Sequence, residues 1–273
     1  MRVIALLATY NEERFVANCL EHLLGQGVQV YLVDNGSTDR TLEVAQRYLG
    51  RGLVAIESMT RSGLFDLKRI LRRKEELASE LDADWFIHLD ADEIRLPPRS
   101  GSTLAEALEE ADKAGYNAVN FQEYTFIPTV ESPDHDHQGY EESMLCYYPF
   151  APFSPHRLNA WKRQDARVDL CSSAGHVVKF PGRSISPLTF LLRHYIFLSV
   201  EHALEKYGRR RHPSAALDSG WHTWREGLEI SSISLPSAKT LRHYTGDDRL
   251  DCSQPLARHP FVIASTAVAA RQA

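Results

Sequence analysis

Trp85-Phe86-Ile87-His88-Leu89-Asp90-Ala91-Asp92-Glu93 is the stretch that decides the fold of this sequence, because a largely apolar run ends directly in three acidic side chains. Such a run is typical of a strand that is buried on both faces of a parallel sheet. In open α/β sheets, ligands bind beyond the carboxyl ends of the strands. The acidic side chains are therefore expected to lie in a binding site at that edge of the sheet.

Further apolar runs alternate with amphipathic stretches on both sides of this strand. Strands are expected at 2–8, 28–33, 53–56, 85–89 and 116–121, and helices at 12–25, 39–49, 63–81 and 103–114. Alternating strands and helices of this length predict an α/β fold through about residue 125. The expected sheet is doubly wound and mostly parallel, with helices on both of its faces.

The alternation becomes weaker after residue 125. Several prolines and an acidic, histidine-rich run predict a long loop at 126–160, and a helix is expected at 200–211. We expect one domain in three parts: an α/β half at 1–125, an elaborated half at 126–245 and a polar tail at 246–273.

Composition excludes several classes of protein. The 273 residues are 43% hydrophobic and 25% charged, which is ordinary for a globular chain. A net charge of −5 provides no basic field, so no nucleic-acid partner is expected. No apolar run reaches the roughly 18 residues of a membrane span, and the four cysteines form no CxxC pair. These features predict a cytoplasmic protein with reduced thiols and no transmembrane segment.

Asp90 and Asp92 are the strongest candidates for chemistry. Side chains alternate along an extended chain, so the two carboxylates are expected on one side, where they would repel each other unless they shared a cation. Mg²⁺ and Mn²⁺ prefer carboxylate oxygens and substrate phosphates, whereas zinc prefers histidine or cysteine. The spacing thus predicts a Mg²⁺ or Mn²⁺ site. The competing interpretation is that these acids only cap the next helix.

Two other expected strands also end in polar residues. Thr9-Tyr10-Asn11-Glu12-Glu13 follows the first strand, and Val33-Asp34-Asn35-Gly36-Ser37-Thr38-Asp39 ends the second. A helix N-terminus at either position favours an anion or a base edge. Taken alone, the second motif is typical of a tight turn followed by a capped helix. Three polar strand ends together favour one shared ligand site.

These motifs, with Leu89-Asp90-Ala91-Asp92-Glu93 as a DxD motif, resemble in order and spacing those of family 2 glycosyltransferases of the GT-A fold. The resemblance covers residues 1–125 well. It implies that this half binds a nucleotide-sugar, with Thr9, Asn11, Glu12 and Asp34 lining the nucleobase and ribose pocket. It also implies that Asp92 ligates a metal ion on the donor diphosphate, with Asp90 close by.

The second half resembles a bacterial subgroup of the same family more weakly, through Gly175-His176, Leu192-Arg193-His194-Tyr195 and the segment 199–211. In GT-A enzymes a downstream histidine often completes the metal shell. The resemblance therefore makes His194 the first candidate ligand and His176 the second, or a contact to acceptor or phosphate. Packing or hydrogen bonding is the competing interpretation for both histidines. This half is thus expected to complete the metal site and to face the acceptor.

Basic side chains are candidates for neutralising the diphosphate. Lys206, Arg209 and Arg210 are spaced to share a helical face, although a basic helix end also complements the helix dipole. Arg61 and Lys68, after the third strand, are lesser candidates for the same task.

The resemblance implies metal-dependent transfer of a sugar from a nucleotide-diphosphate donor to the hydroxyl of a glycan, lipid-linked or small-molecule acceptor, with inversion at the anomeric carbon. Direct displacement needs a carboxylate base, for which Asp165, Asp169 and Glu123 are the candidates. A nucleotidyltransferase is a competing enzyme class, although the sequence shows no Gly-rich triphosphate loop near its N-terminus. A third alternative is a protein that binds a nucleotide-sugar without catalysis.

Overall fold

The computed structural model describes residues 1–61, 63, 65–208, 232–246 and 249–262. The chain divides into two compact units, each made of discontinuous segments. The first unit comprises Met1–Ser62, Asp66–Glu123 and Phe153–His194, and the second comprises Gly63–Phe65, Tyr124–Pro152 and Tyr195–Ala273.

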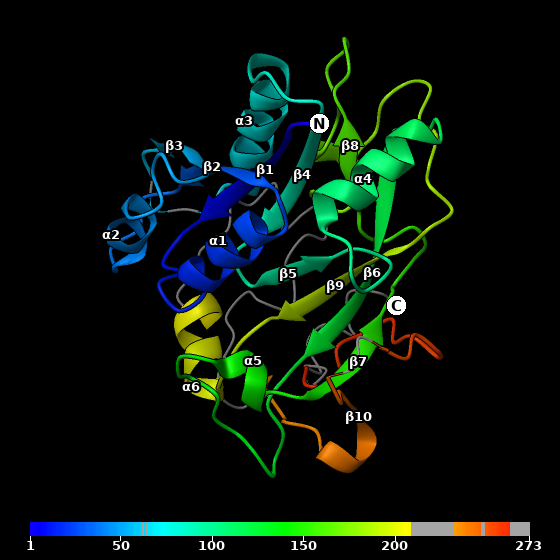
Figure 1. The fold of residues 1–273 in the computed structure, drawn as a ribbon. Coiled ribbons are helices and arrows are strands. Elements are labelled where there is room, and N and C mark those ends of the chain that lie inside the picture. The colour runs from blue at the N-terminus through cyan, green and yellow to red at the C-terminus, as the bar shows by residue number, and fades with distance from the viewer. Residues whose placement is uncertain (62, 64, 209–231, 247–248, 263–273) are drawn as a thin grey trace, which may run out of the picture. The chain divides into compact units, whose positions relative to one another are not determined.

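A parallel sheet forms the centre of the first unit. Its strands are β1 (Val3–Thr9), β2 (Gln29–Asp34), β3 (Leu53–Ser58) and β4 (Trp85–Asp90), in the spatial order β4-β1-β2-β3 (Figure 1). All three pairings between these strands are parallel. Val3 to Leu7 of β1 are almost completely buried, as expected for a strand covered on both faces.

Three helices connect these parallel strands. They are α1 (Val16–Gly25), α2 (Thr41–Gln46) and α3 (Leu67–Glu80). Crossovers between parallel strands are right-handed, and the strand order reverses direction between β3 and β4. This reversal places α1 and α2 on one face of the sheet and α3 on the other. The expectation of a doubly wound α/β fold is confirmed.

Antiparallel strands extend the sheet beyond β4. Strand β8 (Leu158–Lys162) pairs antiparallel with both β4 and β6 (Ala118–Phe126), so it separates two strands that run in the same direction. Strand β5 (Glu93–Leu96) follows β4 after a short turn and pairs antiparallel with β9 (Phe190–Tyr195). Helix α4 (Leu104–Lys113) precedes β6 and begins with a complete capping box at Thr103 and Glu106.

The second unit contains short elements around an aromatic core. Strand β7 (Cys146–Phe150) pairs antiparallel with β10 (Arg242–His243), and the helices are α5 (Tyr140–Ser143) and α6 (Val200–Ala203), which continues as a π-helical turn at Leu204–Gly208. The core consists of Ile127, Tyr148, Phe150, Ile196, Phe197, Ala203, Tyr207 and Phe261. None of the helices in the described ranges is long and apolar enough to cross a membrane.

The expectation of a loop throughout 126–160 is wrong. This segment holds α5, β7 and the start of β8. Strands β7 and β8 have five residues each, and neither shows a regular alternation of exposed and buried positions. Because their burial comes from neighbours that are distant in sequence, local periodicity gives no signal for them.

Glu75 on α3 fixes the segment that leads to Gly175 and His176. Its side chain is buried, and its Oε1 accepts hydrogen bonds from the backbone N–H groups of Leu170 (2.8 Å) and Cys171 (3.0 Å). Its Oε2 accepts from Arg167 at 2.8 Å. One carboxylate therefore satisfies two backbone donors of a segment that belongs to no sheet.

We expect Glu75→Ala to lower the free energy of unfolding by about 3 kcal/mol, because two backbone donors and a guanidinium lose their acceptor. Its helix neighbour Glu76 has a half-exposed side chain that pairs with Arg73. Glu76→Ala is the matched control and should change stability by about 0.5 kcal/mol or less. Urea denaturation of both variants measures the difference, and equal losses would contradict the anchoring role of Glu75.

Candidate active site

The carboxyl ends of three parallel strands bring the sequence motifs together. In the register of the sheet, Thr9 of β1 lies beside Asp34 of β2, and Ala8 lies beside Asp90 of β4. Neighbouring strands are about 4.8 Å apart, so the β2 and β4 ends are separated by about 10 Å. The three polar strand ends thus share one edge of the first unit.

Asp34 organises the loop that follows β2. Its buried carboxylate accepts hydrogen bonds from the hydroxyls of Thr9 (3.2 Å) and Ser37 (2.5 Å). It also accepts from the backbone N–H groups of Gly36 (3.0 Å) and Ser37 (2.9 Å). The Asp34 side chain therefore holds the loop that joins β2 to α2 and ties it to the end of β1.

Asn11 and Glu12 link the β1 end to the same loop. The Asn11 side-chain oxygen accepts from the backbone N–H of Thr38 at 2.8 Å, and the Glu12 backbone N–H donates to the Thr41 hydroxyl at 2.8 Å. Asn11 has a φ of 55°, in the left-handed region that asparagine tolerates. The side chain of Glu12 is buried.

Arg61 lies over the face of Tyr10, with its guanidinium carbon 3.5 Å from the ring centroid. This distance is within the range of a cation–π interaction. Tyr10 was not singled out from the sequence, although an aromatic residue between Thr9 and Asn11 is a usable signal. The structure therefore adds an aromatic side chain to the β1 strand end.

The two acids of the DxD motif have different surroundings. Strand β4 ends at Asp90 and β5 begins at Glu93, so Asp92 lies in the turn between these two strands. Asp90 is exposed, whereas Asp92 is only 4% exposed. Glu93 accepts a hydrogen bond from the backbone N–H of Asp90 at 3.2 Å. This bond connects the two ends of the turn.

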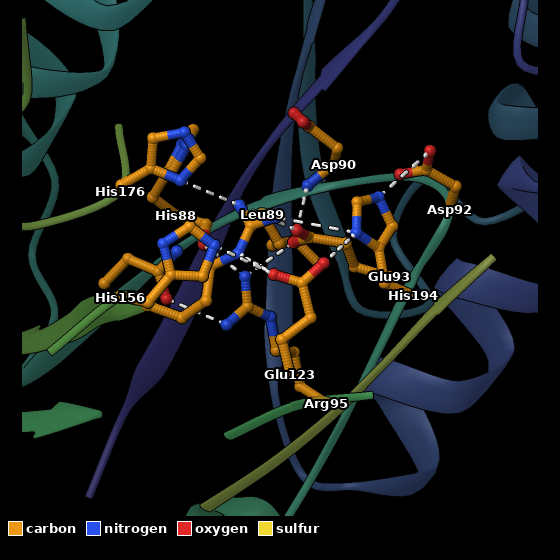
Figure 2. Close-up of polar contacts among 12 residues, drawn as sticks. His88, Leu89, Asp90, Asp92, Glu93, Arg95, Glu123, His156, His176 and His194 are labelled. Carbon is orange, nitrogen blue, oxygen red and sulfur yellow. Dashed lines mark hydrogen bonds and ion pairs between the residues drawn. The ribbon is translucent and has the colours of Figure 1, made fainter. Parts of the chain in front are cut away.

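His194 lies between Asp92 and Glu123, as Figure 2 shows. Its Nδ1 is 2.6 Å from Glu123 Oε1, and its Nε2 is 3.5 Å from Asp92 Oδ2. Strand β9 carries His194 and pairs it in register with Glu93 of β5. Burial alone would lower the pKa of His194, but the charges of Asp92 and Glu123 outweigh burial and raise the pKa to about 9.

Glu123 is the centre of a buried charge network. Besides His194, its carboxylate accepts from Arg157 Nε at 2.7 Å and lies 3.1 Å from His156 Nε2. Burial would raise its pKa, yet Arg157 and His194 hold the pKa of Glu123 well below the usual range. The carboxylate therefore stays ionised, and its surroundings favour holding His194 and Arg157 over accepting a proton.

Arg95 extends this network beneath the DxD turn. It is completely buried and donates to Glu93 Oε2 at 2.5 Å and to Asn159 Oδ1 at 2.8 Å, with its guanidinium over the Phe121 ring. Arg95 and Arg157 were not predicted from the sequence, and Glu93 was expected at this edge of the sheet without a role of its own. Glu93 directly follows the DxD motif and could have been included on that ground.

Two histidines form a stacked pair on the other side of Glu123 from His194. The rings of His156 and His176 are 4.9 Å apart and nearly parallel, and His176 Nδ1 is 3.2 Å from Arg157 Nη1 (Figure 2). His176, the second candidate ligand, is thus held by Arg157 and by stacking. Desolvation by burial lowers the pKa of His156.

The structure places Asp165 apart from the DxD turn. Lys162 at the end of β8 lies opposite Trp85, the first residue of β4, so the segment that follows leaves the sheet at its other edge. The exposed Asp165 lies in this segment. Asp169 accepts a hydrogen bond from the backbone N–H of Ser172 at 2.8 Å, and such bonds hold its pKa below the usual value despite partial burial.

The basic candidates have different locations. Lys68 is exposed near the start of α3, and Lys206 belongs to the second unit, where its ammonium is 5.9 Å from the Tyr207 ring centroid. Arg209 and Arg210 lie outside the described residues.

The acidic strand end has the donor types that suit a divalent cation with few protein ligands. Within the described part of the chain, no group of three or more histidine, cysteine, aspartate or glutamate side chains forms a ready metal site. Asp92 and His194 face each other, and Glu123 fixes the His194 ring through Nδ1, which directs Nε2 toward Asp92. A carboxylate that holds the second nitrogen of a histidine is typical of metal sites. Asp92 and His194 therefore fit such a cation, with Asp90 nearby.

Comparisons with known proteins find a family model and several solved structures that resemble parts of this chain. A family model described as glycosyl transferase family 2 matches residues 5–143. Among curated proteins, no relative matches the chain. S. aureus TarS in complex with UDP is 15% identical over 75% of this chain and 66% of its own, with a TM-score of 0.45. In another S. aureus TarS structure, the match spans only 37% of that chain.

Glucosyl-3-phosphoglycerate synthase from Mycobacterium tuberculosis, solved with Mn²⁺, UDP and glucosyl-3-phosphoglycerate, is 18% identical, with a TM-score of 0.32. That match covers 45% of this chain and 44% of the synthase. The family model spans just over half of the 273 residues and includes all three strand-end motifs. The chain therefore belongs to glycosyl transferase family 2.

Proposed function

We propose that this protein transfers a sugar from a nucleotide-diphosphate sugar to an acceptor hydroxyl with the help of a divalent cation. The observation that carries the proposal is the shared edge of Asp34, Asp90 and Asp92 in a chain of this family. The β2 end would take the nucleoside, where Thr9, Asn11, Glu12 and Asp34 meet. The β4 end, about 10 Å away, would take the diphosphate.

Asp92 and His194 would hold a Mg²⁺ or Mn²⁺ ion, with Asp90 close by and the remaining positions filled by water and the diphosphate. When bound, the cation would neutralise negative charge that grows on the departing nucleoside diphosphate. Arg61, which lies over Tyr10, is a further candidate contact to the donor.

The acceptor would bind on the far side of the donor sugar from the diphosphate. A glycan, a lipid-linked sugar or a small molecule would supply the hydroxyl, and transfer would invert the anomeric carbon. Asp165 and Asp169 stay predicted general bases. Glu123 is ionised and bonded to His194, so the role that we propose for it is to hold the His194 ring. All four cysteines are free thiols, which favours a reducing compartment such as the cytoplasm.

A thermal-shift panel tests the central proposal. The melting temperature would be measured with UDP, GDP, dTDP and CMP, each with and without Mn²⁺. We expect one nucleotide to stabilise the protein more strongly with Mn²⁺ than without it. NMR of the matching nucleotide-sugar then follows slow donor hydrolysis and the configuration of the released sugar. Pyrophosphate release from a nucleoside triphosphate would favour a nucleotidyltransferase, and binding without any hydrolysis would favour a non-catalytic protein.

Asp92→Asn should remove Mn²⁺-dependent nucleotide-diphosphate binding while keeping the fold, because one charge is lost at constant volume. Isothermal titration with Mn²⁺ and the cognate diphosphate measures the loss, which should be about 10-fold or more. The matched control is Asp82→Asn, since the Asp82 side chain is 94% exposed. The metal assignment is wrong if Asp92→Asn binds as the parent does.

The raised pKa of His194 predicts a pH dependence for metal binding. Below about pH 9 the imidazole is protonated, so a cation must displace a proton from Nε2. The Mn²⁺ affinity of the parent should therefore rise about tenfold per pH unit between pH 6.5 and 8. His194→Gln should bind Mn²⁺ about 10- to 100-fold more weakly and lack this slope. The exposed His243 provides the control His243→Gln. An unchanged slope in His194→Gln would show that the proton leaves another group.

A further inference from the structure

Lys74 is a buried cation that the proposed chemistry does not use. It lies on the core-facing side of α3, whose buried residues are Ile70, Leu71, Lys74, Glu75, Leu77 and Ala78. The helical period predicts an apolar side chain at position 74, because it follows Ile70 and Leu71 by four and three residues. The sequence instead places there a lysine that is completely buried.

The Lys74 ammonium donates to two neutral acceptors. Nζ is 2.9 Å from His88 Nδ1 and 3.1 Å from the carbonyl oxygen of Leu89. Burial of an ammonium against neutral groups is unfavourable compared with burial of an apolar side chain of the same volume. Desolvation lowers the pKa of Lys74 to about 8, against the opposing charges of Asp90 and Glu93. Stability alone therefore gives no reason for a lysine at this position.

The two acceptors lie where β4 loses a neighbouring strand. Pairing between β4 and β8 extends only to Ile87, opposite Ala160. Beyond that point, charged side chains hold the β4 backbone: Arg95 at the His88 carbonyl (3.4 Å), Lys74 at the Leu89 carbonyl (3.1 Å) and Glu93 at the Asp90 N–H (3.2 Å). Lys74 thus holds the last carbonyl before the DxD motif.

The same ammonium also fixes the His88 ring. Because Nδ1 accepts the Lys74 hydrogen bond, the proton of the neutral imidazole is on Nε2. The Nε2 atom faces Gly175, where an added Cβ would lie only 2.5 Å away. The position of this ring therefore sets how closely the segment that carries His176 can approach β4.

We propose that Lys74 is a positioning residue for the acidic strand end, which fixes the direction in which Asp90 and Asp92 leave β4 and thereby their affinity for a divalent cation. The metal part of this inference rests on the proposed function. The part that concerns the backbone of the strand end does not, and a separate measurement tests it.

Lys74→Met removes the ammonium and nearly keeps the side-chain volume. Amide hydrogen exchange of the segment 88–93 should become at least about tenfold faster, because the strand end loses a bond that holds it closed. Titration with Mn²⁺ alone should show about 10- to 100-fold weaker binding. The melting temperature should change little, because the loss of an unfavourably buried charge offsets the loss of two hydrogen bonds. A purely structural lysine would give the opposite result, a lower melting temperature with unchanged exchange at 88–93.

Leu77→Met is the matched control, because Leu77 is buried on the same side of α3 and the exchange conserves volume. It should leave exchange at 88–93 and the Mn²⁺ affinity as in the parent. Unchanged exchange in Lys74→Met, or equally fast exchange in both variants, would overturn the proposal. If Lys74→Met does not fold, Lys74→Gln is the second variant, because it keeps a hydrogen-bond donor without the charge. Its exchange at 88–93 should be intermediate between those of the parent and Lys74→Met. Exchange as slow as in the parent would assign the effect to the hydrogen bond alone and would overturn a role for the cation. If the parent binds neither Mn²⁺ nor any nucleotide diphosphate, the proposed function fails, and exchange still decides the role of Lys74.

Discussion

The buried carboxylate of Glu123 is the interaction on which the other parts of the site depend. One of its oxygens is hydrogen-bonded to His194 of β9, and the other accepts a hydrogen bond from Arg157, which precedes β8. Glu123 itself lies on β6, so one side chain joins three segments that are distant in sequence. A buried charge that loses its partner is strongly destabilising, at roughly 3–5 kcal/mol. The carboxylate is therefore tolerated only when all three segments are in place, which makes the site form as a unit.

Charge is balanced in this network before any ligand arrives. Three buried acids, Asp92, Glu93 and Glu123, face three cations, Arg95, Arg157 and the protonated His194. The proposed divalent cation would replace the His194 proton, and the nucleotide diphosphate would bring negative charge nearly equal to the positive charge of the cation. The surrounding charges would then need little rearrangement, which is the condition for electrostatic preorganisation. Most of the side chains that would stabilise a charged donor are already fixed by each other.

The parts of the fold and site that could be predicted from the sequence are those with local signals. Largely apolar runs predicted β1, β2 and β4, and the polar residues that end these runs predicted that Asp34, Asp90 and Asp92 share one edge. The assumption that side chains alternate from Asp90 to Asp92 requires an extended chain. Strand β4 ends at Asp90, so the two acids differ in burial.

Other parts have no local signal. The partners of Glu123 are 34 and 71 residues away in sequence, and nothing in the neighbourhood of Arg157 marks it as a partner of a glutamate. At Lys74, the helical period predicts an apolar residue, and the reason for a lysine becomes visible only once β4 lies beneath α3. Long-range pairs of this kind require coordinates, because neither periodicity nor spacing encodes them.

The insertion of β8 between β4 and β6 has a consequence for the order in which the chain can fold during synthesis. One edge of β4 has no strand to pair with until residues 158–162 have emerged, about 70 residues after β4 itself. At roughly 5–20 residues per second, a ribosome needs roughly 4–14 seconds to add that length. During this interval the nascent chain presents an apolar strand edge, which is a template for pairing with another chain. Strand β8 thus covers the free edge of β4, and the rate of translation sets how long that edge stays unpaired.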